Sequence, residues 1–272
     1  MKILISTDIE GVAGVYHPEQ TRAGNGEYER ARRLMTEEAN AAIAGAFEGG
    51  ASEVFVNDSH GGFRNLLPDL LDARAQVVQG KPRYLSMVAG VDEPGMAAVC
   101  MIGYHSRAQG RGILAHTINS FAFARVWLNE QELGEMGIYG ALAGEYGVPV
   151  VMASGDDVFI GEHRPLFPHT RFVQTKRATG HTAGISLAPA AACAAIRAGV
   201  AEALRAPRPR PLVLSGTITV RIQTQTAALA DLFCQWPTLQ RLAGDEIGFE
   251  APTVEAAVRM INSLSAMSAM LR

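Results

Sequence analysis

The chain begins with Met1-Lys-Ile-Leu-Ile-Ser-Thr7, an apolar segment that runs directly into Asp8-Ile9-Glu10-Gly11. The apolar run predicts a buried strand over residues 2–7. Side chains alternate between the faces of a strand, so Asp8 and Glu10 project to the same side. Two like charges at the end of a core strand are costly unless a cation or hydrogen-bond donors compensate them. Because open α/β sheets bind ligands at the carboxyl ends of their strands, the pair indicates a metal site. A hydrogen-bonded turn is the alternative.

Strand and helix patterns alternate along the N-terminal half. Apolar residues recur every four positions from Met35 to Phe47, which predicts a helix over residues 27–48, and Gly49-Gly50 ends it. Further strands are expected at residues 53–57, 97–103, 121–128 and 149–153, with another helix from Glu135. This order predicts an α/β fold in three layers around a mainly parallel sheet.

The C-terminal portion is smaller and less regular, and its pattern is that of an α+β structure. Strands are expected at residues 171–176, 212–223 and 246–250, and helices at 189–206, 227–234 and from residue 252. A proline-rich linker, residues 207–211, interrupts them. We therefore expect an α/β metal-binding domain of residues 1–155 and a C-terminal subdomain of residues 156–272. The second would complete the active site and make oligomer contacts.

The composition excludes several classes of protein. The 272 residues are 48% hydrophobic and 19% charged, which is typical of a soluble globular protein. A net charge of −3 with interspersed signs gives no reason to expect nucleic acid or an anionic membrane as partner. No apolar run has the length of a membrane span. The apolar run at the N-terminus is too short for a signal peptide, because the acidic Asp8 interrupts it, so we expect none. Three widely spaced cysteines without a C-x-x-C motif predict free thiols in the reducing cytoplasm.

Three more side chains that could bind a metal lie at the ends of predicted strands or at the start of a predicted helix. His60 comes after the strand at residues 53–57, His105 after that at 97–103, and Glu135 at the start of a helix. Each alone could be structural, a histidine as a hydrogen-bonded residue and Glu135 as a partner of the helix dipole. Together with Asp8 and Glu10 they would place three carboxylates and two imidazoles at one sheet edge. Such ligands suit zinc, manganese or iron, and a bridging carboxylate such as Asp8 could hold two metal ions.

Several motifs together resemble the metallo-D-aminopeptidase family typified by a bacterial dipeptide-operon protein. Their order and spacing fit the family from residue 1 to about residue 190. The matching stretches are Ser6-Thr-Asp-Ile-Glu-Gly11, Glu29-Arg30, Met35-Thr-Glu-Glu-Ala-Asn40, Val56-Asn-Asp-Ser-His60, Gly103-Tyr-His105, Ala115-His116, Gly134-Glu135 and Gly155-Asp-Asp157.

The resemblance implies a centre of two zinc ions per chain and a ring-shaped homodecamer that encloses the active sites. Carried over by position, Asp8 would be shared between the ions. The other ligands would be Glu10, His60, His105 and Glu135, and the catalytic residue would be His116. All six positions hold the residue type that the family pattern requires.

The expected reaction is release of an N-terminal residue, preferably a D-amino acid, from a short peptide by a metal-activated water. His116 would then transfer protons or stabilise the oxyanion. One alternative is another two-metal hydrolase, an amidase or a phosphoesterase. The other is a non-catalytic oligomeric protein with a structural metal, but His116, which is surplus to the ligand set, favours catalysis.

Three conspicuous residues outside this set remain. Lys176 matches a lysine of the family and could reach the site to bind a carboxylate or carbonyl. The alternative is an ordinary surface lysine at a strand end. His163 and His169 lie near prolines, and we expect both side chains to be exposed to solvent.

Overall fold

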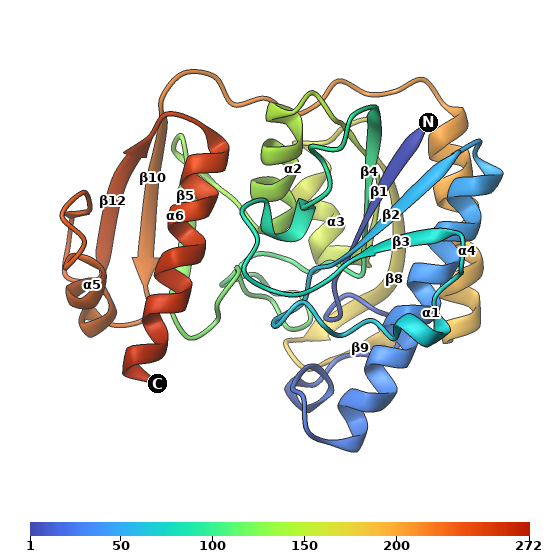
Figure 1. The fold of residues 1–272 in the computed structure, drawn as a ribbon. Helices are drawn as coiled ribbons and strands as arrows, with labels where there is room; N and C mark the ends of the chain where they lie inside the picture. The colour runs from blue at the N-terminus through green and yellow to red at the C-terminus, as the bar shows by residue number, and fades with distance from the viewer.

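Two β-sheets organise the protein in a computed structural model, which describes residues 1–272 (Figure 1). The first has seven strands in the order β3-β2-β1-β4-β7-β8-β9, all parallel except β9, which pairs antiparallel with β8. Their bounds are β1 (Lys2–Thr7), β2 (Glu53–Asp58), β3 (Ala75–Val78), β4 (Met96–Ile102), β7 (Val150–Asp156), β8 (Arg171–Gly180) and β9 (Ala183–Ser186).

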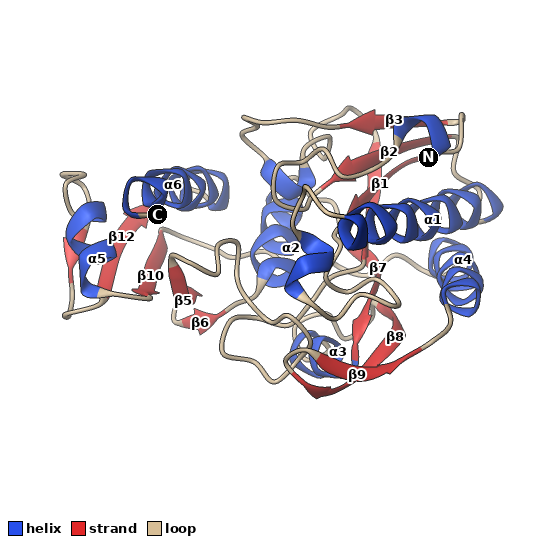
Figure 2. Ribbon diagram, turned by 90° about the horizontal axis from the view of Figure 1, so that it is seen from below, coloured by secondary structure: helices blue, strands red, loops and turns tan.

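Helices cover both faces of this sheet. Figure 2 shows α1 (Gly26–Glu48) and α4 (Pro189–Arg205) on one side, with α2 (Glu135–Glu145) and α3 (Asp157–His163) on the other. The alternation within β1 explains the two cores, because Ile3 and Ile5 pack in the cluster that contains α1, whereas Leu4 packs in the cluster that contains α2. The expected three-layer, mainly parallel α/β fold is thus confirmed.

The second sheet has five antiparallel strands in the order β11-β12-β10-β5-β6. Its strands are β5 (Phe123–Leu128), β6 (Gln131–Glu132), β10 (Ile218–Thr224), β11 (Gln240–Arg241) and β12 (Glu246–Ala251). Two helices, α5 (Ala227–Phe233) and α6 (Val254–Met267), pack against β10 and β12. Because α6 also packs against α2, which covers the seven-stranded sheet, it connects the two sheets. Four short 3-10 helices complete the chain: η1 (Pro18–Thr21), η2 (Pro68–Leu70), η3 (Ser86–Val88) and η4 (Ser268–Leu271).

The division that we expected after residue 155 does not coincide with the two sheets. β8, β9 and α4 follow this position but belong to the seven-stranded sheet and its cover, whereas β5 and β6 precede it but belong to the second sheet. The reason is the antiparallel pairing of β5 with β10, a contact between distant segments that local patterns do not report. The segment at residues 206–217, which crosses the top of Figure 1, carries the chain back to the second sheet.

None of the helices combines the length and the apolar composition that a membrane span requires.

His163 contradicts the expectation of an exposed loop residue. It ends α3, its exposed fraction is 2%, and its ring packs on Phe159 with the centroids 4.7 Å apart. The Nδ1 atom lies 2.8 Å from the carbonyl oxygen of Phe159. Burial, together with the nearby charges of His105 and Arg107, lowers the pKa of His163 to about 4. His169 is exposed, as predicted.

This buried imidazole makes the stability of the protein depend on pH. The folded pKa of His163 lies below its unfolded value of 6.5, so its stabilising contribution is complete above pH 6.5 and is lost as the pH falls toward 4. The loss amounts to about 3 kcal/mol at the lower end of this range. Replacing His163 with Gln should remove that part of the pH dependence. Urea unfolding of both proteins between pH 7 and pH 4 measures it, and the difference between them cancels the groups that they share. Parallel pH profiles would contradict the assignment.

Candidate metal centre

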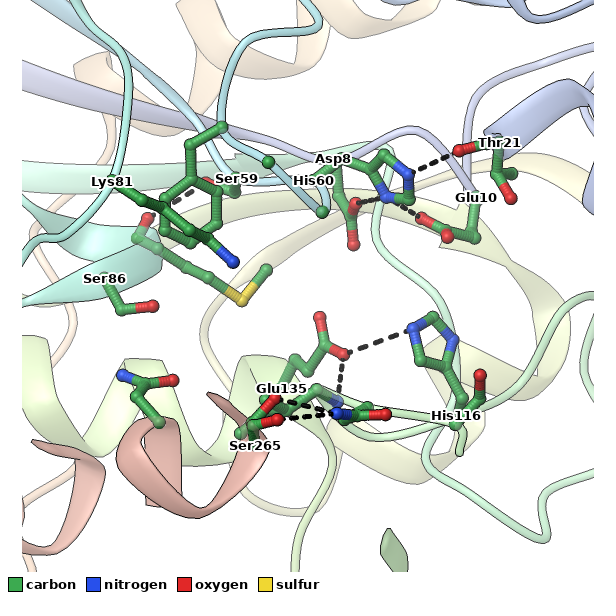
Figure 3. A pocket seen from close by; sticks show the side chains of 18 of the residues that line it. Asp8, Glu10, Thr21, Ser59, His60, Lys81, Ser86, His116, Glu135 and Ser265 are labelled. Carbon is green, nitrogen blue, oxygen red and sulfur yellow. Dashed lines mark hydrogen bonds and ion pairs between the residues drawn. The ribbon is translucent and has the colours of Figure 1, made fainter. Parts of the chain in front are cut away.

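The topology of the first sheet brings the predicted site residues together. Asp8, His60 and His105 follow the adjacent strands β1, β2 and β4, so all three stand at the same carboxyl edge. Glu10 lies in the turn after β1, and Glu135 is the first residue of α2. His116 comes from the long loop between β4 and β5. Figure 3 shows Asp8, Glu10, His60, His116 and Glu135 turned toward one space.

The two oxygen atoms of Asp8 face different histidines. Oδ1 lies 3.3 Å from Nδ1 of His60, and Oδ2 lies 3.3 Å from Nε2 of His105. A second carboxylate accompanies each imidazole, since Nδ1 of His60 is 3.0 Å from Oε2 of Glu10 and Nε2 of His105 is 3.4 Å from Oε2 of Glu135. Each side of Asp8 therefore has one further carboxylate and one imidazole.

His116 stands beside these five residues. Its ring stacks on that of His105, with the centroids 4.2 Å apart and the planes 9° apart, and its Nε2 lies 3.8 Å from Oε1 of Glu135. The side chain is 21% exposed, whereas that of His105 is buried. His116 therefore borders the open space that a substrate would enter.

Backbone carbonyl groups orient all three imidazoles. In each ring, the nitrogen that faces away from the carboxylates lies close to a carbonyl oxygen. Nε2 of His60 is 2.9 Å from the oxygen of Thr21, Nδ1 of His105 is 3.0 Å from that of Ser106, and Nδ1 of His116 is 2.9 Å from that of Leu114. Because a carbonyl can only accept, this nitrogen carries the proton in the neutral ring. The nitrogen that faces the centre then keeps its lone pair, the arrangement found around metal-binding histidines.

The donor atoms fit a divalent cation. Oε2 of Glu10 and Nε2 of His105 are buried and have no hydrogen-bond partner. Two sets of three ligand atoms lie within 4.8 Å of one another, one from Asp8, Glu10 and His105, the other from His105, His116 and Glu135. His60 belongs to neither set although it approaches Asp8 and Glu10, and one set includes His116. Oxygen and nitrogen donors without sulfur match zinc.

The imidazoles and carboxylates of the centre also compensate one another's charges. Burial opposes ionisation of His60, but the negative charges of Glu10 and Asp8 raise its pKa well above the ordinary value. Burial also opposes ionisation of His105, but the negative charges of Glu135 and Asp8 outweigh this effect and raise its pKa well above the ordinary value. The pKa of Glu10 is lowered despite its burial, chiefly by His60, and that of Glu135 is lowered by His105. A bound cation would take the place of the imidazolium protons.

Glycine at position 11 lets the two ligand-bearing loops touch. The amide of Gly11 donates to the oxygen of Gly103 at 2.7 Å, and a Cβ at position 11 would lie 2.0 Å from the oxygen of Tyr104. Any larger residue would therefore push the loop of Asp8 away from the loop of His105. From β8, the hydroxyl of Thr175 donates to the oxygen of Gly11 at 2.9 Å.

Lys176 is neither a surface lysine nor a residue of the cavity. It is 2% exposed, and its ammonium donates to the carbonyl oxygens of Glu10 at 2.5 Å and Val15 at 2.6 Å. Burial lowers the pKa of Lys176 to about 8, so it remains charged at neutral pH. Lys176 thus fixes the backbone from which the Glu10 side chain projects.

Replacing Lys176 with Met keeps the stem but removes both hydrogen bonds to this loop. The Glu10 backbone then loses its anchor, and zinc affinity should fall roughly 10- to 100-fold, as when outer partners of metal ligands are removed. Competition with a chelator measures the affinity. Arg177→Met changes the neighbouring exposed residue and should leave the affinity unchanged. Equal affinities for the two variants would show that Lys176 does not position Glu10.

A cavity of about 900 Å³ opens above the carboxylates, and its other walls carry no motif that sequence reasoning could find. The C-terminal segment contributes Asn262 and Ser265 from α6 and Ser268 from η4. Asn119, in the loop that carries His116, donates to the hydroxyls of Ser265 at 2.9 Å and Ser268 at 3.1 Å. These small polar residues line the cavity because α6 packs beside α2, a contact that local sequence patterns do not report.

Comparison with known proteins agrees with this geometry. A family model described as D-aminopeptidase matches residues 1–263. A D-aminopeptidase of Bacillus subtilis (strain 168) is 38% identical over 192 residues, which are 71% of this chain and 69% of that protein. A solved structure described as "Zn-dependent D-aminopeptidase DppA from Bacillus subtilis, a self-compartmentalizing protease" matches with a TM-score of 0.94 and 29% identity. It covers 99% of this chain and 98% of that one.

The family resemblance read from the sequence motifs is therefore confirmed. With the family model spanning nearly its whole length, the chain belongs to the D-aminopeptidase family and is an enzyme of the peptidase hydrolase class.

Proposed function

We propose that this D-aminopeptidase holds two zinc ions per chain and uses them to release N-terminal D-amino acids from short peptides. The observation that carries the proposal is the position of Asp8, whose two oxygens face two different imidazole–carboxylate pairs. A single ion would need only one of these pairs. The zinc dependence printed for the solved relative supports the choice of metal.

The proposed ligands divide into two groups around Asp8. Glu10 and His60 would complete one ion's set, because both lie on the Oδ1 side. His105 and Glu135 would complete the other, on the Oδ2 side. Protein ligands alone would not fill the coordination of either ion, which leaves positions for water and substrate, as catalytic zinc sites require.

When bound, zinc would supply the Lewis acidity that activates a water molecule and polarises the scissile carbonyl. His116 would move the protons. Its Nδ1 is held by the Leu114 carbonyl, so Nε2 in the neutral ring can accept a proton from the attacking water. The same atom can return the proton to the leaving amine, or the protonated ring can stabilise the oxyanion. Its place at the border of the cavity gives it access to both groups.

Short peptides suit the cavity, since about 900 Å³ is within the usual range for small-ligand pockets. We propose that the chain forms a ring-shaped homodecamer with the active sites inside, supported by the description of the solved relative as a self-compartmentalizing protease. We also propose that it acts in the cytoplasm, where its three free cysteines, Cys100, Cys193 and Cys234, would stay reduced.

The decisive experiment is a zinc-reconstituted assay on paired D- and L-alanyl peptides, with zinc counted per chain. We expect two zinc ions and faster hydrolysis of the D-peptide. Equal rates on both peptides would remove the D preference, and hydrolysis after complete zinc removal would remove the mechanism. A phosphate ester serves as the third substrate, because its turnover would favour a different two-metal hydrolase.

A further inference from the structure

The charged side chains of the cavity are divided between two regions. The carboxylates of Asp8, Glu10 and Glu135 belong to the metal centre. Cationic side chains line other parts of the wall, among them Lys81 and Arg83. Figure 3 shows the Lys81 side chain directed into the same space as the carboxylates of Asp8 and Glu135.

Lys81 has no anionic partner within the chain. Its ammonium lies over the ring of Phe63, 4.4 Å from the centroid, and forms no salt bridge or hydrogen bond within the chain. The guanidinium of Arg83 lies over the same ring, 3.9 Å from its centroid. Burial and this second cation lower the pKa of Lys81. The two cations on Phe63 thus form a positive region of the cavity wall, in which the Lys81 ammonium pairs with no anion of the chain.

Arg83 is committed to the protein, whereas Lys81 is free. The guanidinium of Arg83 donates to the oxygens of Val78 at 3.0 Å and Asp58 at 2.7 Å, and to Oδ1 of Asn57 at 3.1 Å. It therefore serves as a fixed positive charge against the ring. Lys81 keeps all three of its N–H donors for a ligand.

The other cationic side chains of the cavity are less suited to bind an anion. Arg22 pairs with Glu19 at 3.8 Å and its side chain is 72% exposed, so it faces solvent. Arg272, directly after η4, lies over the ring of Phe121, and no second cation shares that ring. Lys81 alone combines a free ammonium with a neighbouring fixed positive charge.

We propose that Lys81 binds the free C-terminal carboxylate of the peptide substrate, and this rests on the proposed function. An aminopeptidase places the N-terminal residue and the scissile carbonyl at the metal centre, so the rest of the peptide extends along the cavity. Each further residue spans about 3.3–3.6 Å, so only a short peptide places its terminal carboxylate within the cavity. The enzyme would then recognise both ends of its substrate and select short, uncapped peptides.

The test compares D-alanyl-D-alanine with its C-terminal amide, which lacks the negative charge. We expect the zinc-loaded enzyme to prefer the acid. Lys81→Met should lower kcat/KM for the acid about tenfold, mainly through KM, and leave the amide unchanged. Lys81→Arg should restore the preference. Arg272→Gln is the matched control and should retain it. An equal loss on both peptides, an unchanged preference in Lys81→Met, or a preference lost only in Arg272→Gln would each overturn the proposal.

Calorimetric binding separates this proposal from the proposed function. In a zinc-loaded His116→Gln background, the acid should bind about tenfold more tightly than the amide, and adding Lys81→Met should abolish the difference. If the wild-type enzyme hydrolysed neither peptide, the proposed function would fail while the binding ratio would still decide the role of Lys81. Equal binding of acid and amide to the protein that retains Lys81 would refute it.

Discussion

Replacing His116 with Gln is expected to lower kcat by two to four orders of magnitude, the usual contribution of a general acid–base residue, while both zinc ions stay bound. The His116 imidazole borders the cavity but belongs to neither of the two imidazole–carboxylate pairs that face Asp8. Its Nδ1 is fixed by Leu114, and only Nε2 faces the centre. Steady-state kinetics and zinc analysis on the same sample measure the two effects.

Zinc content is the critical part of this experiment, because His116 also belongs to one of the two compact sets of ligand atoms. A variant that loses one zinc ion would show that His116 is a ligand and not a proton carrier. His181→Gln provides the control, since His181 lines the same cavity but takes no part in the cluster. It should keep nearly full turnover.

Replacing Asp8 with Asn should have the largest effect on the metal itself. The amide keeps the shape of the side chain but has one oxygen in place of two, so it cannot serve both imidazole–carboxylate pairs. We expect fewer than one zinc ion per chain and a loss of turnover by more than about a thousandfold, since both roles of the metal depend on the shared ligand. Zinc counting after dialysis and kcat/KM measure these outcomes.

Glu10→Gln is the comparison that gives the Asp8 experiment its meaning. Glu10 stands on only one side of Asp8, so its replacement should release one ion and leave the other. Identical zinc contents in the two variants would contradict the assignment of Asp8 as the shared ligand. Far-ultraviolet circular dichroism of both proteins checks that the sheet remains folded.

The strand-end part of the site was predictable because it depends on local patterns. Each apolar run ends at a polar side chain, and the β-α-β order requires that neighbouring parallel strands end at one edge. Asp8, His60 and His105 follow from this rule alone. Glu135 was a candidate ligand for a different reason, as the first residue of a predicted helix, and the role of His116 came only from the family resemblance.

The parts that were missed depend on contacts between distant segments. The edge strands β3 and β9 bury none of their side chains fully and so lack the apolar alternation of a buried strand. His163 and Lys176 are polar residues whose burial arises from tertiary packing, which periodicity does not report. The division between the two sheets was not predictable for the same reason, since no local pattern near β5 indicates that it pairs with β10.

That pairing also bears on the order of events during biosynthesis. His116 precedes β5 and Glu135 follows β6, so the two side chains are tied to a hairpin whose partner strand leaves the ribosome much later. The seven-stranded sheet can collapse as soon as α4 has emerged, in line with N-terminal units folding first. The metal centre cannot mature at that stage, because β5 still presents an unpaired edge. Zinc is therefore expected to enter only after translation has passed β10, and a nascent chain arrested before that strand should bind it poorly.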